Sequence, residues 1–195
     1  MKRTICQLAA LTLLSTNLSG CIFAALGAAG TATYIGVQER TPGKAVDDTV
    51  IWGKIKEKYL QQNAKDLLAG VNVEVIEGRV HLTGLVYLPH TRVDAVRLAW
   101  QVDGVKEVVN EIQIRPEKDK KWSTIATDSW ISAQVRSKLL FDKNVRSINY
   151  SIDVILGVVY LMGIARNQEE LEIVEDISRT TKGVEKVVSY VRIEK

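Results

Sequence analysis

The side chains that could perform catalysis or hold a metal are few in this sequence. It contains two histidines and two cysteines in 195 residues. His81 lies in a segment typical of a strand, and His90 follows Pro89 at an expected helix start. Neither histidine has cysteines or paired carboxylates at the spacing that metal binding or acid–base catalysis requires. The sequence therefore predicts a protein that is not an enzyme, with no catalytic residue, metal site, cofactor or small-molecule substrate.

Cys21 has a different chemistry. The chain begins with Lys2 and Arg3, continues through the apolar run ICQLAALTLL and then reaches small residues, which is the layout of a secretory signal peptide. The stretch Leu18-Ser19-Gly20-Cys21 follows directly and resembles the bacterial lipobox, at which the cysteine is lipidated and becomes the new amino terminus. We therefore expect residues 1–20 to be a lipoprotein signal peptide and Cys21 to carry lipid. The alternative is that Cys21 is an ordinary small residue near a cleavage site.

The expected lipid also predicts a location. Several acyl chains anchor a protein far more firmly than one chain does. In lipoproteins of this type an aspartate after the cysteine usually marks retention in the inner membrane, and this chain has Ile22 there. We therefore expect an outer-membrane anchor with the protein facing the periplasm. Loss of Lys2 and Arg3 with the signal leaves 24 basic and 23 acidic residues, a balance that argues against nucleic acid as a partner.

Two copies of one pattern follow the anchor. Residues 22–46 are rich in Ala, Gly and Thr and contain a Pro-Gly pair, so we expect 21–47 to be the lipidated N-terminus and a flexible tether. Beyond it, many positions recur after 80 or 79 residues, and one residue lost before the second hairpin explains the change of offset. The recurring pairs are Asp48/Asp128, Ile51/Ile131, Lys58/Lys138, Leu60/Leu140, Gly78/Gly157, Val80/Val159, Leu82/Leu161, Gly84/Gly163, Gly104/Gly183, Val105/Val184, Val108/Val187 and Val109/Val188.

The two copies predict the same order of elements, αββαβ. Asp48 and Asp128 are candidate N-caps of a first helix, which spans 48–60 in the first copy. Two short strands follow, joined by a tight hairpin turn at Gly78 or Gly157, where a positive φ is needed. A second helix (90–102 and 168–181), a Gly-Val turn and a last strand complete each copy. The expected fold class is α+β, with domains at 48–115 and 127–195 and a charged linker at 116–126.

The hairpin G-x-V-x-L-x-G, followed by a helix and G-V-x-x-V-x-x-x-[IV], is similar to the BON domain. Lipobox, tether and two copies together resemble the dual-BON outer-membrane lipoproteins of the DolP family. The resemblance implies that each domain has a small three-stranded mixed sheet packed against two helices. It also implies a non-enzymatic protein that binds anionic phospholipid, supports envelope integrity and is associated with the cell-division site. In that family the lipid contact lies on the first helix of the second BON domain.

The first helix of the second copy has the residues that such a contact needs. Trp130 and Phe141 point more than about 120° away from the core stripe, which consists of Ile131, Val135 and Leu139. The first copy has Val50 where the second has Trp130. A tryptophan at a membrane boundary can bury its ring and keep its N–H in a polar environment, and flanking cations can meet lipid phosphates. The expected phospholipid-binding residues are Trp130, Gln134, Arg136, Lys138 and Phe141.

Three alternatives stay open. In the first alternative, Trp130 packs against the other repeat or against Trp122 and covers the boundary between the two domains. In the same way, Phe141 could turn inward at the end of its helix. The apolar hairpin tip Leu156-Gly157-Val158 is either a second membrane contact or a turn buried against a neighbour. The protein as a whole is alternatively an envelope interaction or chaperone-like scaffold, whose partners are envelope or outer-membrane assembly proteins and whose lipid only sets its location.

Overall fold

The computed structural model describes residues 42–115 and 122–194. The chain divides into two units, Met1–Val37 and Gln38–Lys195, and the second unit contains both repeats. The expected signal peptide, Cys21 and most of the expected tether lie outside the described residues. Among the described residues, no helix combines the length and the apolar character needed to cross a bilayer.

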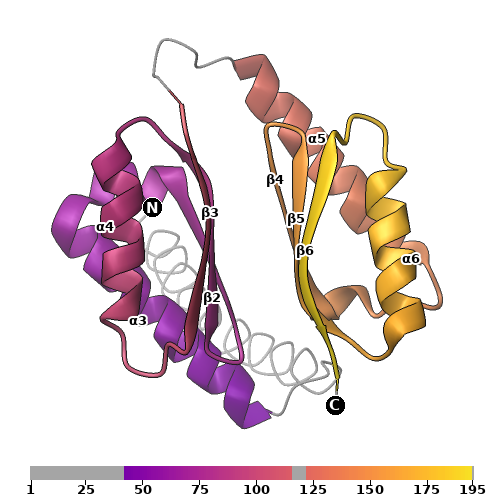
Figure 1. Cartoon of the computed structure of the whole chain (residues 1–195), viewed down its shortest axis with the longest axis horizontal. Helices are drawn as coiled ribbons and strands as arrows, with labels where there is room; N and C mark the ends of the chain where they lie inside the picture. The colour runs from indigo at the N-terminus through magenta and orange to yellow at the C-terminus, as the bar shows by residue number, and fades with distance from the viewer. Residues whose placement is uncertain (1–41, 116–121, 195) are drawn as a thin grey trace, which may run out of the picture. The chain divides into compact units, whose positions relative to one another are not determined.

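The first repeat folds as predicted from its pattern (Figure 1). Its middle strand pairs antiparallel with the strand before it and parallel with the last strand, so the sheet order is β1-β2-β3. Two helices pack against this mixed sheet. The elements in chain order are α3 (Pro42–Gly70), β1 (Val71–Ile76), β2 (Arg79–Val86), α4 (Pro89–Trp100) and β3 (Glu107–Ile114).

The second repeat has the same architecture with the sheet order β4-β5-β6. A short 3-10 helix precedes its first strand. Its elements are α5 (Trp122–Phe141), η2 (Ser147–Asn149), β4 (Tyr150–Ile155), β5 (Val158–Ala165), α6 (Gln168–Arg179) and β6 (Lys186–Ile193). The predicted α+β fold with two αββαβ repeats is confirmed.

Each repeat encloses its own hydrophobic core. The predicted stripe on α5 is completely buried, and Ile55 and Tyr59 form a matching buried stripe on α3. Leu82 and Leu161, at the centres of the middle strands, are completely buried. Both cores are closed by residues of the described part of the chain. A fragment that starts at Gln38 therefore keeps every described residue of both cores.

The first helices are longer than predicted. The helix expected at 48–60 extends over Pro42–Gly70, because Ala45 and Leu67 beyond the expected ends are buried. Proline suits this first turn, where no backbone N–H is needed. In the second repeat the helix begins at Trp122, so residues 122–126 of the expected linker are helical.

The predicted N-cap roles of Asp48 and Asp128 are wrong. Both lie inside their helices, and both carboxylates accept hydrogen bonds from the backbone of the hairpin turn instead. Asp48 accepts from the N–H groups of Glu77 and Gly78, each at 2.8 Å. Asp128 accepts from the equivalent N–H groups in the second hairpin, at 2.8 and 2.9 Å.

The hairpin turns need this support because both of their central residues have positive φ. The angles are 54° at Glu77 and 78° at Gly78, and 54° at Leu156 and 77° at Gly157. This left-handed pair matches the twist of a two-residue hairpin, and its N–H groups point together toward one acceptor. One aspartate per repeat therefore joins the first helix to the tip of the hairpin.

Candidate functional site

Helix α5 presents three faces, and only one of them is its core stripe. Successive residues turn about 100° around a helix, so Trp130, Gln134 and Phe141 fall on one side. We call this side, with Trp130 and Phe141 at its ends, the Trp130 face. Ser129, Ser132 and Arg136 fall roughly a third of a turn away, on a side that lines a cavity. The helix therefore carries two separate surfaces outside the core.

The Trp130 face is exposed. Trp130 has 50% of its surface accessible and Phe141 has 80%. Leu140, which the sequence analysis did not single out, is 66% exposed on a neighbouring side of the same helix. Its apolar character off the core stripe was the signal that could have identified it. Phe141 does not turn inward at the end of the helix, so that alternative is excluded for the described structure.

The side chains of the two cations predicted for this site point in different directions. Lys138 donates from Nζ to the hydroxyl of Thr181 at 3.0 Å, so it leans toward the loop between α6 and β6. Arg136 donates from Nε to the hydroxyl of Ser132 at 3.2 Å and from Nη2 to the carbonyl oxygen of Ile152 at 2.5 Å, so its side chain extends across β4. Gln134 is half-buried, and its amide nitrogen has no hydrogen-bond partner among the described residues.

Trp130 therefore shares one side of α5 with Gln134 and Phe141. Lys138 lies on the flank of this side, and Arg136 lies on the cavity side of the helix. Trp130 also borders the turn at Gly183, where an added Cβ would come within 4.0 Å of its ring. Gly157 at the hairpin tip is buried, and Leu156 and Val158 beside it are half-buried. The tip is thus partly covered by the protein itself.

The sheets of the two repeats meet at a polar seam that does not use Trp130. Thr83 donates to a carboxylate oxygen of Asp153 at 2.5 Å, and Gln113 donates to the hydroxyl of Tyr160 at 3.2 Å. The hydroxyl group of Tyr190 donates a hydrogen bond to a carboxylate oxygen of Glu111. Three apolar side chains from the two repeats, Ile76, Met162 and Ile164, pack together beside these hydrogen bonds.

Arginines complete the seam. Arg79 donates to Glu107 at 2.8 Å and to the carbonyl oxygen of Tyr190 at 3.1 Å, and Arg192 donates to the same Glu107 at 3.0 Å. The two guanidinium groups hold the pKa of Glu107 below its usual value. The seam is thus built from the strands, and sequence periodicity had given no sign of it.

His81 is a structural residue of this seam. It is 97% buried, and its ring lies 5.1 Å from that of Tyr190 and 6.2 Å from that of Tyr160. Burial lowers its pKa, although the carboxylates of Asp153 and Glu111 oppose that shift. Within the described ranges, no three His, Cys, Asp or Glu side chains are grouped in a way that could hold a metal ion.

The first repeat also exposes an aromatic on its first helix, which the sequence analysis had not expected. Trp52 in α3 is 45% exposed, and Val50, at the position of Trp130, is 48% exposed. Trp52 corresponds to Ser132 rather than to Trp130, so it lies on a different side of its helix. The two first helices therefore differ in where an aromatic is exposed, rather than in whether one is.

The sequence matches the model of the BON domain twice, over residues 47–116 and 127–195. The chain belongs to the BON domain family. The predicted resemblance to dual-BON lipoproteins is also confirmed by the relatives. The chain is 32% identical to the outer membrane lipoprotein DolP of Haemophilus influenzae, over 88% of this chain and 87% of that protein.

Two further relatives match this chain over most of its length. An uncharacterized protein of Anaplasma centrale, encoded in the gshII 5' region, is 46% identical over 76% of this chain and 95% of its own length. The osmotically inducible protein Y of Escherichia coli is 28% identical over 74% of this chain and 72% of its own length.

Proposed function

We propose that this chain is a lipid-anchored protein of the outer membrane that faces the periplasm and binds anionic phospholipid through the Trp130 face of α5. The observation that carries the proposal is the exposure of Trp130, Leu140 and Phe141 on one helix of a folded domain. The relationship to an outer membrane lipoprotein supports the location. Support of envelope integrity is the cellular role that this binding would serve.

The dimensions of α5 suit contact with a surface. Trp130 and Phe141 are eleven residues apart, which corresponds to about 16 Å along a helix. Both rings reach a bilayer together only when the helix lies parallel to it, as interfacial helices do. Burial of one large apolar side chain contributes about 1.5–3 kcal/mol. Two or three such contacts give modest binding, which the expected anchor at Cys21 would strengthen by raising the local concentration.

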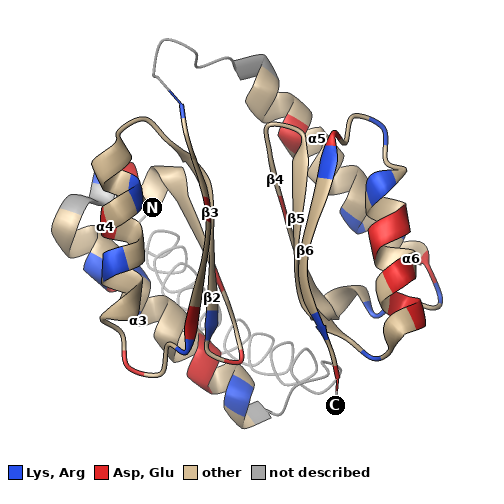
Figure 2. Ribbon diagram, viewed as in Figure 1, with Lys and Arg blue, Asp and Glu red and all other residues tan. Residues whose placement is uncertain are grey.

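Charge favours the same orientation. Helix α6 carries acidic residues along its length and a single basic residue, Arg179, in its last turn (Figure 2). An anionic bilayer repels such a helix. Lys138 lies on the flank of the Trp130 face, where it attracts lipid phosphates without direct insertion, whereas Arg136 lies on the cavity side of α5. The domain therefore approaches an anionic surface best with α5 toward it.

Vesicle flotation of the fragment that starts at Gln38 tests the proposal without the anchor. We expect the fragment to float with vesicles of phosphatidylglycerol and phosphatidylcholine, and to float much less with phosphatidylcholine alone. Trp130→Glu places a charge in the contact and should abolish flotation, while the free energy of unfolding changes by less than about 1 kcal/mol because Trp130 lies off the core.

Two matched variants control for the change. Trp52→Glu alters the same residue type at nearly the same exposure in the first repeat, and Val50→Glu alters the position equivalent to Trp130. Both should leave flotation nearly intact. Normal flotation of Trp130→Glu would contradict the proposed contact. If the unmodified fragment does not float with either vesicle, the protein-interaction scaffold becomes the better account.

A further inference from the structure

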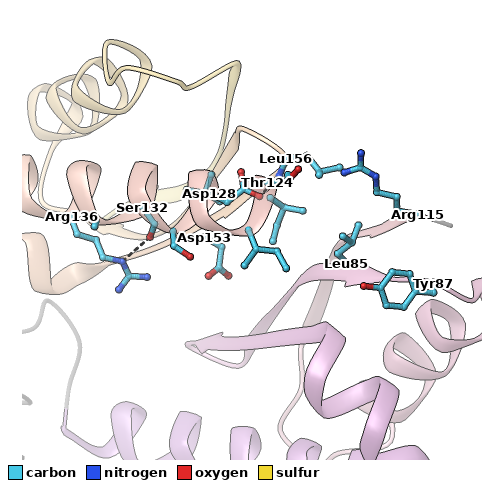
Figure 3. Close-up of a pocket in the computed structure, with 14 residues that line it drawn as sticks. Leu85, Tyr87, Arg115, Thr124, Asp128, Ser132, Arg136, Asp153 and Leu156 are labelled. Carbon is cyan, nitrogen blue, oxygen red and sulfur yellow. Dashed lines mark hydrogen bonds between the residues drawn. The ribbon is translucent and has the colours of Figure 1, made fainter. Parts of the chain in front are cut away.

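A cavity of about 440 Å³ lies beside α5, and Ser132 and Arg136 are among the residues of this helix that line it (Figure 3). Small-molecule pockets generally have about 300–1,000 Å³, so the cavity has the capacity of a ligand site. Its walls come from both repeats. Leu85 and Arg115 belong to the first, and Ile125, Val154 and Leu156 are among those from the second.

Most of the cavity wall is apolar, and the polar groups at one end already form hydrogen bonds with other groups of the protein. There Arg136 is held by Ser132 and by the carbonyl oxygen of Ile152, and Asp153 accepts from Thr83. Figure 3 shows this group at one end of the row of labelled side chains and Arg115 at the other. The first end therefore has its principal hydrogen bonds made within the protein.

The other end keeps a cation available. The guanidinium group of Arg115 makes no ion pair or hydrogen bond with any described residue, although its backbone N–H pairs with Val86. Asp128, a carboxylate that also lines the cavity, already accepts hydrogen bonds from two backbone N–H groups of the hairpin. A guanidinium group whose donors are not used by any described residue, and which lies beside an apolar wall, matches a phosphate attached to a hydrocarbon chain.

We propose that this cavity binds a single-chain amphiphile with a phosphate head, and that Arg115 binds the head while the chain lies along Leu85, Ile125 and Leu156. The ligand class is that of a lysophospholipid. The inference rests on the proposed function, since an anionic membrane is the source of such a molecule. It assigns to α5 a second lipid site, distinct from the Trp130 face.

The direct test is calorimetric titration of the fragment from Gln38 with dodecyl phosphate below its critical micelle concentration. We expect saturable binding of one molecule per chain. Dodecyltrimethylammonium has the same chain with a cationic head, and inorganic phosphate has the charge without the chain. Neither should bind measurably. Equal binding of both dodecyl compounds would overturn the role of the cation.

Two independent changes address the site itself. Arg115→Gln should weaken dodecyl phosphate binding about tenfold, the loss expected for one charge-assisted hydrogen bond. Arg136→Gln and Arg179→Gln, which remove guanidinium groups at the opposite end of the cavity and on α6, should change it less. A larger loss in Arg136→Gln than in Arg115→Gln would overturn the assignment of the head.

Ser129→Trp should fill the cavity and abolish binding, because Ser129 is exposed and lines the wall. Ser137→Trp adds the same ring to an exposed position of α5 outside the cavity and should leave binding unchanged. Unaltered binding in a folded Ser129→Trp variant would show that the ligand lies elsewhere. Circular dichroism establishes folding, and Arg115→Gln tests the site separately.

The two lipid sites can be distinguished in the same variants. Trp130→Glu should lose flotation with vesicles and keep the affinity for dodecyl phosphate, because Trp130 does not line the cavity. Ser129→Trp should show the reverse. Loss of flotation alone would therefore concern the Trp130 face, and absence of dodecyl phosphate binding in a fragment that floats normally would overturn the cavity site alone.

Discussion

Leu82 and Leu161 occupy the same place in the two repeats, at the centre of the middle strand, and both are completely buried. Truncation to alanine leaves a cavity in a packed core. We expect Leu82→Ala and Leu161→Ala each to lower the free energy of unfolding by about 2–5 kcal/mol. Urea denaturation of the fragment from Gln38 measures the loss. Leu88→Ala, at a position 46% exposed, is the control and should cost far less.

His81 makes the seam sensitive to acid. Burial lowers its pKa below the value of about 6.5 that it has in the unfolded chain. The unfolded chain therefore binds the proton more readily, and the stability contributed by neutral His81 is lost as the pH falls below that value. The groups around it are Asp153 and Glu111, which oppose the shift, Arg79, which reinforces it, and Tyr160 and Tyr190.

We expect the free energy of unfolding to fall between about pH 7 and pH 5, before the carboxylates titrate. His81→Phe should remove most of this dependence while keeping a ring between the two tyrosines. His90→Phe changes an exposed histidine and should keep it. Urea denaturation at several pH values measures the slope, and an equal slope in the His81 variant would contradict the role given to the seam.

Cys21 is the one residue of the candidate sites that lies outside the described structure, and its chemistry has its own test. Cys21→Ser replaces the thiol that a lipid would modify. We expect this change to abolish incorporation of radioactive palmitate in cells and to leave the protein unprocessed or released from the membrane fraction. Continued labelling of the serine variant would contradict lipidation at this position.

At the scale of the elements, the link between the first helix and the hairpin is the least obvious support of the fold. Asp128→Ala leaves the N–H groups of Leu156 and Gly157 without their acceptor, so we expect a loss of about 1–3 kcal/mol. Asp176→Ala, at an exposed position of α6, should cost little. Faster hydrogen exchange at Leu156 and Gly157 would locate the change, and unaltered exchange there would contradict it.

Local pattern was enough to predict most elements. Alternation of apolar residues gave the strands, glycine at positions 78 and 157 gave the hairpins, and the apolar period gave the core stripes. Local pattern did not predict where the first helices begin. An aspartate that caps a helix cannot be distinguished in a sequence from one that accepts hydrogen bonds from a distant turn. The carboxylate is the acceptor in both cases, and only the tertiary fold determines which N–H group donates to it.

At the scale of the whole molecule, the Trp130 face could be predicted and the seam could not. Exposure of Trp130 follows from its position around one helix, which is local information. The seam depends on which side chains of β2, β3, β5 and β6 face one another across the two repeats, and no spacing in the sequence reports that. The cavity beside α5 has the same origin, since Leu85 and Arg115 come from the first repeat.

Two contacts of the seam join a residue to its own counterpart. His81 packs near Tyr160, and Glu111 accepts a hydrogen bond from Tyr190. The residues of each pair are 79 positions apart, which is the offset that relates the repeats. In a symmetric homodimer, residues near the twofold axis meet themselves in this way. At these two contacts, the seam therefore resembles the region near the twofold axis of a homodimer. Because both repeats belong to one chain, unlike in a homodimer, equivalent positions can differ between them. The first repeat has the carboxylate of Glu111 where the second has the phenol of Tyr190, and only the second has Trp130 at its position.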